Sequence, residues 1–87
     1  MKHLILITVI ALTGLAAQAR KSCTELPKDK WMKEDDFKKK VEGLGYKINT
    51  FKQPGSCYEI YGLNKDGKKV EIYFNPVDAS IVKEEID

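Results

Sequence analysis

The chain has 87 residues, of which 15 are basic and 13 acidic, so its formal net charge is only +2. This balance argues against nucleic-acid binding, which requires a strongly basic surface. The length allows a single domain, and a domain of this size buries so little surface that it is only marginally stable without an additional cross-link.

Residues 1–19 have the three parts of a secretory signal peptide. Residues 1–3 form a short basic start, residues 4–15 form an apolar run, and residues 17–19 (Ala-Gln-Ala) match a cleavage site. The apolar run is shorter than the ~20 residues that a membrane-spanning helix needs. We therefore expect a domain of 68 residues to be released into the periplasm, or alternatively secreted, with no membrane attachment after cleavage.

Residues 20–30 are predicted to form an irregular lead segment, because Pro27 blocks regular structure. This segment contains Cys23, one of the two cysteines of the chain. In an oxidising compartment, an even pair of cysteines in a small domain predicts a disulfide, here between Cys23 and Cys57. The alternative is a free or metal-binding thiol pair, which would make a poor metal site without histidine.

An amphipathic helix is predicted after the lead segment. Its apolar positions recur at i, i+4 and i+7 and so share one face, which consists of Phe37, Val41 and Leu44. Acidic residues 34–36 occupy the first turn, where the helix dipole favours negative charge. Gly45 supplies a left-handed stop.

The remaining residues predict four strands of an antiparallel meander, separated by turn-forming segments. The fold class is therefore α+β, with one N-terminal helix packed on a three- to four-stranded antiparallel sheet. In the first strand, Ile48 and Phe51 are three residues apart, so either a β-bulge intervenes or one of them points outward. The predicted strands are Tyr46 to Lys52, Tyr58 to Leu63, Lys69 to Phe74 and Ile81 to Ile86.

The alternation of apolar residues fixes the register of the central hairpin. Ile60 can oppose Ile72 only if the loop has an odd number of residues, and a three-residue loop ending in left-handed Gly67 meets this condition. The predicted core pairs are Tyr58 with Phe74, Ile60 with Ile72 and Gly62 with Val70. The predicted outward pairs are Glu59 with Tyr73 and Tyr61 with Glu71.

The only histidine is His3, inside the predicted signal peptide. The mature chain therefore lacks the histidine that Ser-His-Asp and Cys-His catalysis and most zinc sites use. The paired acids at residues 35–36 and 84–85 have solvated surroundings. We expect no catalytic residues, no cofactor and no metal, and hence not an enzyme.

Two places in the sequence are candidate partner-binding sites. One is the outward set on the central hairpin, because tyrosine is enriched among the residues that anchor interfaces; the set comprises Glu59, Tyr61, Glu71 and Tyr73. The other is Trp31. Each also has a structural interpretation: tyrosines suit the solvated face of a sheet without any function, and Trp31 is placed to cover the start of the helix and the open end of the sheet.

The stretch from Trp31 to Val82 resembles the PepSY domain, found in propeptides of thermolysin-type metallopeptidases and in the sporulation protein YpeB. The cysteines resemble those of the small stand-alone exported subgroup. The chain departs from the family pattern at Lys33, at Asn75 and in the turn at residues 78–80, where a Thr-Gly-Glu type sequence is usual. The matching motifs are Trp31 before an acidic helix start, Gly45-Tyr46, Gly55-Ser56-Cys57-Tyr58-Glu59-Ile60, Asp66-Gly67-Lys68, and Val70-Glu71-Ile72-Tyr73 leading to Asn75-Pro76.

The resemblance implies a PepSY-like domain at residues 31–87 and a role in restraining peptidases or binding peptide-like segments. We therefore expect a non-enzymatic regulator or inhibitor of an envelope peptidase, acting through an exposed strand edge or through the outward set. The alternative is an envelope structural or ligand-sequestering protein without a protease partner. The sequence makes no prediction about the oligomeric state.

Overall fold

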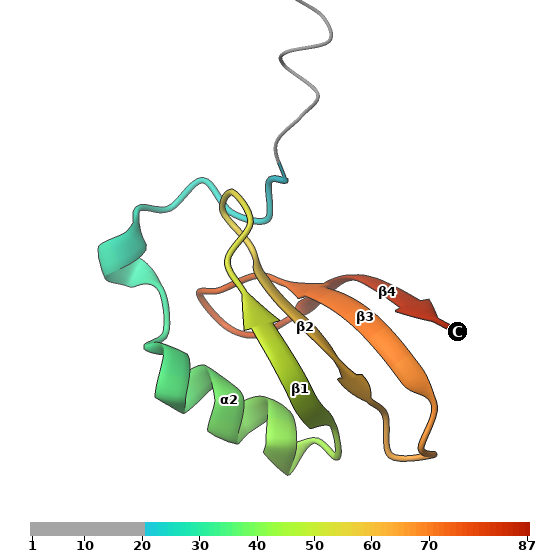
Figure 1. Cartoon of the computed structure of the whole chain (residues 1–87). Helices are drawn as coiled ribbons and strands as arrows, with labels where there is room; N and C mark the ends of the chain where they lie inside the picture. The colour runs from blue at the N-terminus through green and yellow to red at the C-terminus, as the bar shows by residue number, and fades with distance from the viewer. Residues whose placement is uncertain (1–20) are drawn as a thin grey trace, which may run out of the picture.

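The computed structural model describes residues 21–87, so the predicted signal peptide lies outside the described residues. One α-helix precedes a four-stranded antiparallel sheet with strand order β1-β2-β3-β4, which confirms the predicted α+β class. Figure 1 shows α2 lying across one face of the sheet, with β4 at the edge farthest from it. The elements are η1 (Lys28–Lys30), α2 (Glu34–Gly43), β1 (Lys47–Lys52), β2 (Tyr58–Leu63), β3 (Lys69–Phe74) and β4 (Ile81–Ile86).

Helix α2 buries a shorter apolar face than the sequence predicts. Phe37 and Val41 are fully buried, whereas Leu44 is 56% exposed. The prediction that Leu44 faces the core with them is wrong, because the helix ends at Gly43 and Leu44 is already its C-cap. Gly45 then adopts a left-handed φ of 104°, which turns the chain into β1.

Phe37 is the centre of the core. Its ring packs against Tyr58 and Phe74 with centroid distances of 4.8 and 5.0 Å, both edge-on, and against Phe51 at 5.8 Å. Edge-on contacts add to the stabilisation that burial of the rings provides. The Tyr58 hydroxyl donates to the Met32 carbonyl at 2.6 Å, so the polar end of this core residue is satisfied and ties the helix start to β2.

The β2–β3 hairpin has the predicted register in every pair, with Ile60 opposite Ile72 and Tyr61 opposite Glu71. The loop also has the predicted geometry, because Gly67 adopts a φ of 81°. The Asn64 carboxamide oxygen accepts hydrogen bonds from the amides of Asp66 and Lys68. Such side-chain acceptors replace the strand partners that loop amides lack.

A β-bulge in β1 resolves the position of Ile48 and Phe51. The register shifts between Ile48 and Thr50, so Ile48 opposes Gly62 and Phe51 opposes Ile60, and both pack against the core. The bulge brings the backbone of β1 unusually close to β2. A side-chain carbon at Gly62 would overlap the Lys47 carbonyl oxygen, which explains a glycine inside a strand.

The turn before β4 contains a non-glycine residue in the left-handed region. Ala79, in the middle of the turn at residues 78–80, adopts a φ of 63°. The Asn75 carbonyl accepts a hydrogen bond from the Ala79 amide at 2.8 Å, and its carboxamide accepts one from the Val77 amide at 2.9 Å. Alanine in this conformation costs roughly 1–2 kcal/mol, which these hydrogen bonds help to offset.

The segment before α2 is fastened to the β1–β2 loop by a disulfide between Cys23 and Cys57, with a Cα–Cα distance of 5.0 Å. Hydrogen bonds reinforce the attachment: the Ser56 amide donates to the Lys21 carbonyl at 3.2 Å, and the Cys23 amide donates to the Ser56 hydroxyl at 2.9 Å. Gly55 allows the approach, because any side chain there would overlap the Lys21 carbonyl. The start of the described chain therefore has a fixed position beside β2.

Candidate binding site on the outer face of the sheet

The outer face is the face of the sheet opposite α2, and no helix of the described residues packs on it. Glu59 lies opposite Tyr73, and Tyr61 lies opposite Glu71, so the acids and tyrosines alternate over β2 and β3. The structure thus brings together the whole outward set that the sequence predicts. We name it the tyrosine–carboxylate cluster, consisting of Glu59, Tyr61, Glu71 and Tyr73.

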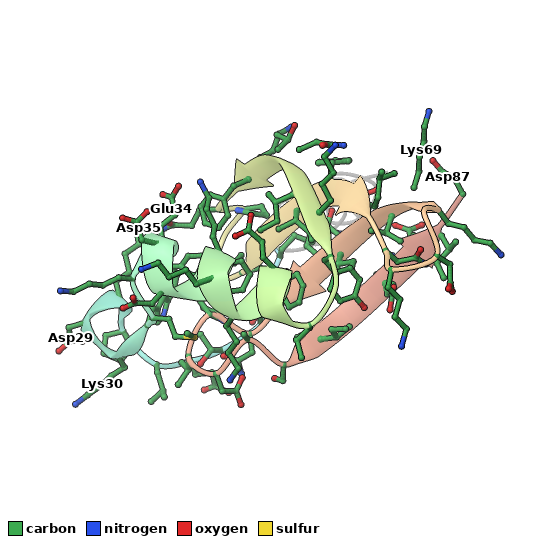
Figure 2. All side chains as sticks on the ribbon, turned by 90° about the horizontal axis from the view of Figure 1, so that it is seen from below. Asp29, Lys30, Glu34, Asp35, Lys69 and Asp87 are labelled. Carbon is green, nitrogen blue, oxygen red and sulfur yellow. A yellow bond between two sulfur atoms is a disulfide. The ribbon has the colours of Figure 1, made fainter. Side chains whose placement is uncertain are left out.

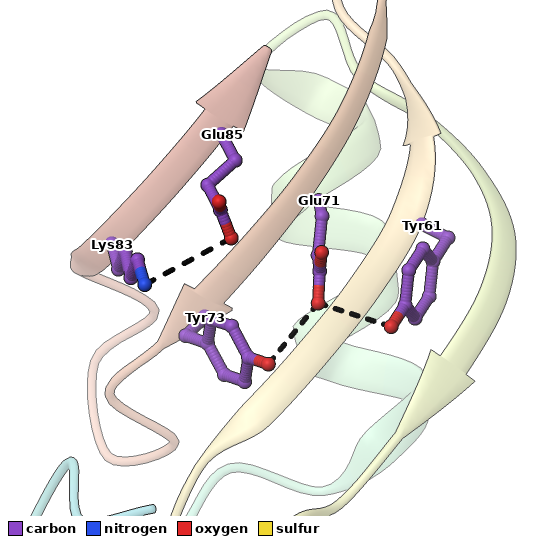
Figure 3. Close-up of polar contacts among 5 residues, drawn as sticks. All are labelled: Tyr61, Glu71, Tyr73, Lys83 and Glu85. Atoms are coloured by element: carbon purple, nitrogen blue, oxygen red, sulfur yellow. Dashed lines mark hydrogen bonds and ion pairs between the residues drawn. The ribbon is translucent and has the colours of Figure 1, made fainter. Parts of the chain in front are cut away.

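Glu71 is the hub of the cluster. Its Oε2 atom accepts hydrogen bonds from the hydroxyls of Tyr61 at 3.0 Å and Tyr73 at 3.1 Å, as Figure 3 shows. Hydrogen bonding to the Glu59 carboxyl, and then to the two tyrosines, lowers the pKa of Glu71. The hydrogen bond to Glu71 is also the main reason why the pKa of Tyr61 rises to about 12.

Glu59 is the buried member of the cluster. Its side chain lies on the outer face, yet the residue is only 4% exposed. Its Oε2 atom has no hydrogen-bond partner. Burial, and then the neighbouring Glu71, raise the pKa of Glu59. Of the two adjacent carboxyl groups, Glu59 therefore holds its proton to the higher pH, and Glu71 carries the negative charge.

Two lysines of the same chain lie on the tyrosine rings of the cluster. The Lys21 ammonium is 4.9 Å from the ring centroid of Tyr73, and the Lys52 ammonium is 5.2 Å from that of Tyr61. These are cation–π distances. The ion pairs formed among residues 21–87 are Lys38–Glu34 and Lys83–Glu85, so neither carboxyl of the cluster has a paired cation there.

A hollow of about 210 Å³ adjoins the cluster, between the bulge of β1 and the end of β4. Tyr61 and Glu71 belong to both the cluster and the hollow. The sequence pattern alone does not predict this hollow, although Leu63 and Lys69 continue the same outward alternation. No sequence pattern predicts the approach of Lys21 to the cluster. The hollow is lined by Asn49, Tyr61, Gly62, Leu63, Lys69, Val70, Glu71 and Asp87.

A second hollow of about 290 Å³ lies on the helix side, between the end of α2 and β4. Leu44 and Ile81 give it an apolar part, and Glu84 lies close enough to Tyr46 to help burial raise the pKa of that tyrosine. Among residues 21–87, the buried side-chain atom without a hydrogen-bond partner is Oε2 of Glu59, which lies on the outer face. The outer face is therefore the stronger candidate site.

Trp31, the remaining candidate residue, is not part of this site. It is half-buried against the core that α2 covers, with its ring edge-on to Tyr58 at 5.7 Å. Its indole nitrogen donates to the Leu26 carbonyl at 3.0 Å. These contacts fit the structural interpretation, in which Trp31 covers the start of the helix.

The described part of the chain gathers no three side chains of the kind that hold a metal ion. None of the helices in residues 21–87 has the length and apolar character required to cross a membrane.

The model of the family described as peptidase propeptide and YPEB domain matches residues 3–85. Comparisons with curated proteins and with solved structures gave no match. PepSY domains are generally non-catalytic propeptide or regulatory modules and are typically extracytoplasmic, which the Cys23–Cys57 disulfide fits. With nearly its whole length matched and the fold in place, the chain belongs to the PepSY family.

Proposed function

We propose that the protein is an exported, non-enzymatic PepSY domain that regulates an envelope peptidase by binding it through the outer face of its sheet. The observation that carries this proposal is Glu59, a buried carboxyl group with an unpaired oxygen on a face that no described helix covers. An unsatisfied buried polar group costs roughly 1–3 kcal/mol, a large share of the stability of a small domain. A binding partner that supplies the missing donor would explain why the group is there.

The compartment and domain limits support the same proposal. Residues 1–19 have the features of a signal peptide, and the disulfide requires an oxidising environment to persist. We propose cleavage after residue 19, a disulfide-anchored lead segment at residues 20–30, and the PepSY domain at residues 31–87. The periplasm is the proposed location, with secretion as the alternative.

The strand edges are less suited to binding than the outer face. Edge strands that avoid pairing with other chains carry bulges and lysines. β1 has a bulge at residue 49 and a lysine at each end, and β4 has a register shift beside Lys83. Both edges thus carry protection against strand addition. Of the two routes considered for a partner, the cluster face is the better supported.

A ligand-sequestering role is the second candidate, and the helix-side hollow favours it. Leu44 and Ile81 expose apolar surface there, beside Tyr46 and Glu84. A small amphipathic molecule would fit such a lining. This role would require no peptidase and would leave the outer face without effect on function.

The proposal is tested by adding the exported protein to envelope extract and measuring casein hydrolysis. The isosteric double variant Glu59→Gln/Glu71→Gln removes both carboxyl groups of the cluster. Its matched control, Glu25→Gln/Glu42→Gln, removes two exposed carboxyl groups elsewhere. We expect the wild type and the control to change the rate of hydrolysis and the cluster variant to leave it unchanged. No effect of the wild type, or an equal effect of all three proteins, would refute the proposal.

A further inference from the structure

The hollow beside the tyrosine–carboxylate cluster combines acidic and apolar walls. Glu71 and Asp87 supply carboxylates, and Lys69 is the basic residue of the lining. Leu63 and the ring of Tyr61 add apolar surface. Figure 2 shows Lys69 and Asp87 together at the end of the molecule opposite η1. Lysine and arginine side chains have a long apolar stem and a charged end, so they match such a lining.

The two tyrosines already attract cations of the same chain. Lys21 reaches the ring of Tyr73 from the lead segment, and Lys52 reaches the ring of Tyr61 from β1. Both ammonium groups contact the rings, and neither forms an ion pair with a carboxyl group of the cluster. Within residues 21–87, the carboxyl groups of Glu59 and Glu71 therefore have no ion-pair partner.

The buried oxygen of Glu59 is an independent sign of a missing ligand. It has no donor, although Tyr61, Glu71 and Tyr73 surround the carboxyl group. Both tyrosine hydroxyls donate to Glu71 instead. The oxygen itself is buried, so an arriving donor reaches it only after a covering side chain moves aside, whereas a cationic donor can pair with Glu71 directly.

We propose that the outer face binds a lysine or arginine side chain of an extended basic peptide, with the cation against Glu59 and Glu71 and the stem in the hollow. This inference rests on the proposed function in one respect, since it assigns a chemical class to the partner of the same face. The cation supplies the donor that the cluster lacks, and Asp87 adds negative charge at the rim of the hollow.

Binding is tested by fluorescence anisotropy with a dye-labelled peptide of alternating lysine and glycine, with glutamine replacing lysine in the control peptide. We expect saturable binding of the lysine peptide only. Glu59→Gln/Glu71→Gln should weaken it at least tenfold, and Glu25→Gln/Glu42→Gln less than twofold. Equal weakening by both variants, equal binding of the glutamine peptide, or no saturable binding would overturn the inference.

A second pair of variants tests the site through a gain in affinity, because a gain in affinity cannot arise from misfolding. Lys69→Gln removes the basic residue from the hollow and should tighten binding of the lysine peptide two- to fivefold. Lys68→Gln removes an equal charge one residue away, outside the lining, and should change binding less than Lys69→Gln. Equal tightening by the two variants would show general charge attraction and would contradict the site.

The two proposals fail separately. If the protein binds the lysine peptide but has no effect on casein hydrolysis, the cation site is supported and the peptidase role is refuted. If it alters casein hydrolysis through the cluster but does not bind the lysine peptide, the peptidase role is supported and the assignment of a basic partner is refuted.

Discussion

Tyr61 and Tyr73 stand on neighbouring strands, and their hydroxyl groups donate to the same carboxylate oxygen of Glu71. The arrangement follows from the hairpin register, which places an acid opposite a tyrosine twice in succession. It concentrates negative charge on Glu71 and leaves Glu59 buried beside it. The tyrosine–carboxylate cluster therefore has one carboxyl group that is readily ionised, Glu71, and one that holds its proton to higher pH, Glu59.

The titration of Glu59 predicts a pH-dependent effect of Glu59→Gln. Its pKa is raised above the ordinary value of 4.5, so the native state binds the proton more tightly than the unfolded state. Wild-type stability therefore falls as pH rises from 4.5 through the raised pKa. We expect Glu59→Gln to be more stable than the wild type above the raised pKa, and the difference to vanish below pH 4.5.

The measurement is urea unfolding of the wild type, Glu59→Gln and the exposed control Glu25→Gln from pH 4 to pH 8. Lys52 lies opposite Glu59 on β1 and Glu71 is its acidic neighbour, and both remain in the variant. A variant that is less stable than the wild type throughout the range would show that the Glu59 carboxylate stabilises the fold, contrary to this account.

The disulfide is predicted to be a major source of stability. The two cysteines are separated by 34 residues, and closing a loop of this length stabilises a fold by roughly 3–4 kcal/mol. Cys23→Ser/Cys57→Ser should lose this amount in urea unfolding, and reducing agent should lower the stability of the wild type equally. A wild type that is indifferent to reducing agent, or that shows two titratable thiols when denatured without reductant, would contradict the prediction.

Gly62→Ala tests the close approach of β1 and β2. The added carbon would overlap the Lys47 carbonyl oxygen, so the strands must separate, at a cost of about 2 kcal/mol or more. Gly43→Ala is the matched control, because no atom lies within 4 Å of the added carbon at the end of α2. Alanine there should be neutral or stabilising by up to about 1 kcal/mol. Similar thermal midpoints for the two variants would argue against the bulge.

Phe37→Ala and Leu44→Ala separate two positions that the sequence assigns to the same helix face. Phe37 is fully buried among three aromatic rings, and its loss should cost about 3–5 kcal/mol. Leu44 is 56% exposed, so its truncation should cost less than about 0.5 kcal/mol. Denaturant unfolding of both variants checks this difference, and a large loss for Leu44→Ala would place that residue in the core after all.

The sequence predicted the sheet better than it predicted the ends of the elements. Alternation fixed the pairing of Ile60 with Ile72, because a shift by one residue would have exposed every core residue of the strand. The period of α2 did not reveal where the helix stops, so Leu44 was misassigned. For Ile48 and Phe51, the spacing showed that an irregularity exists but not which kind, since that depends on the partner strand.

The candidate site was predictable in its members and not in its chemistry. Strand parity placed the four cluster residues on one face, as the structure shows. Parity carries no information about which side chain is buried, so the unpaired oxygen of Glu59 required the structure. The approach of Lys21 to Tyr73 depends on the disulfide and on a segment distant in sequence, which no local pattern encodes.

The proposed binding of a peptidase is tested most directly by capture from envelope extract on immobilised residues 20–87, with bound proteins eluted and assayed for peptidase activity. We expect the wild type and Glu25→Gln/Glu42→Gln to retain the same peptidase and Glu59→Gln/Glu71→Gln to retain little of it. Recovery of no peptidase by the wild type, or equal recovery by all three proteins, would contradict the claim that the outer face binds one.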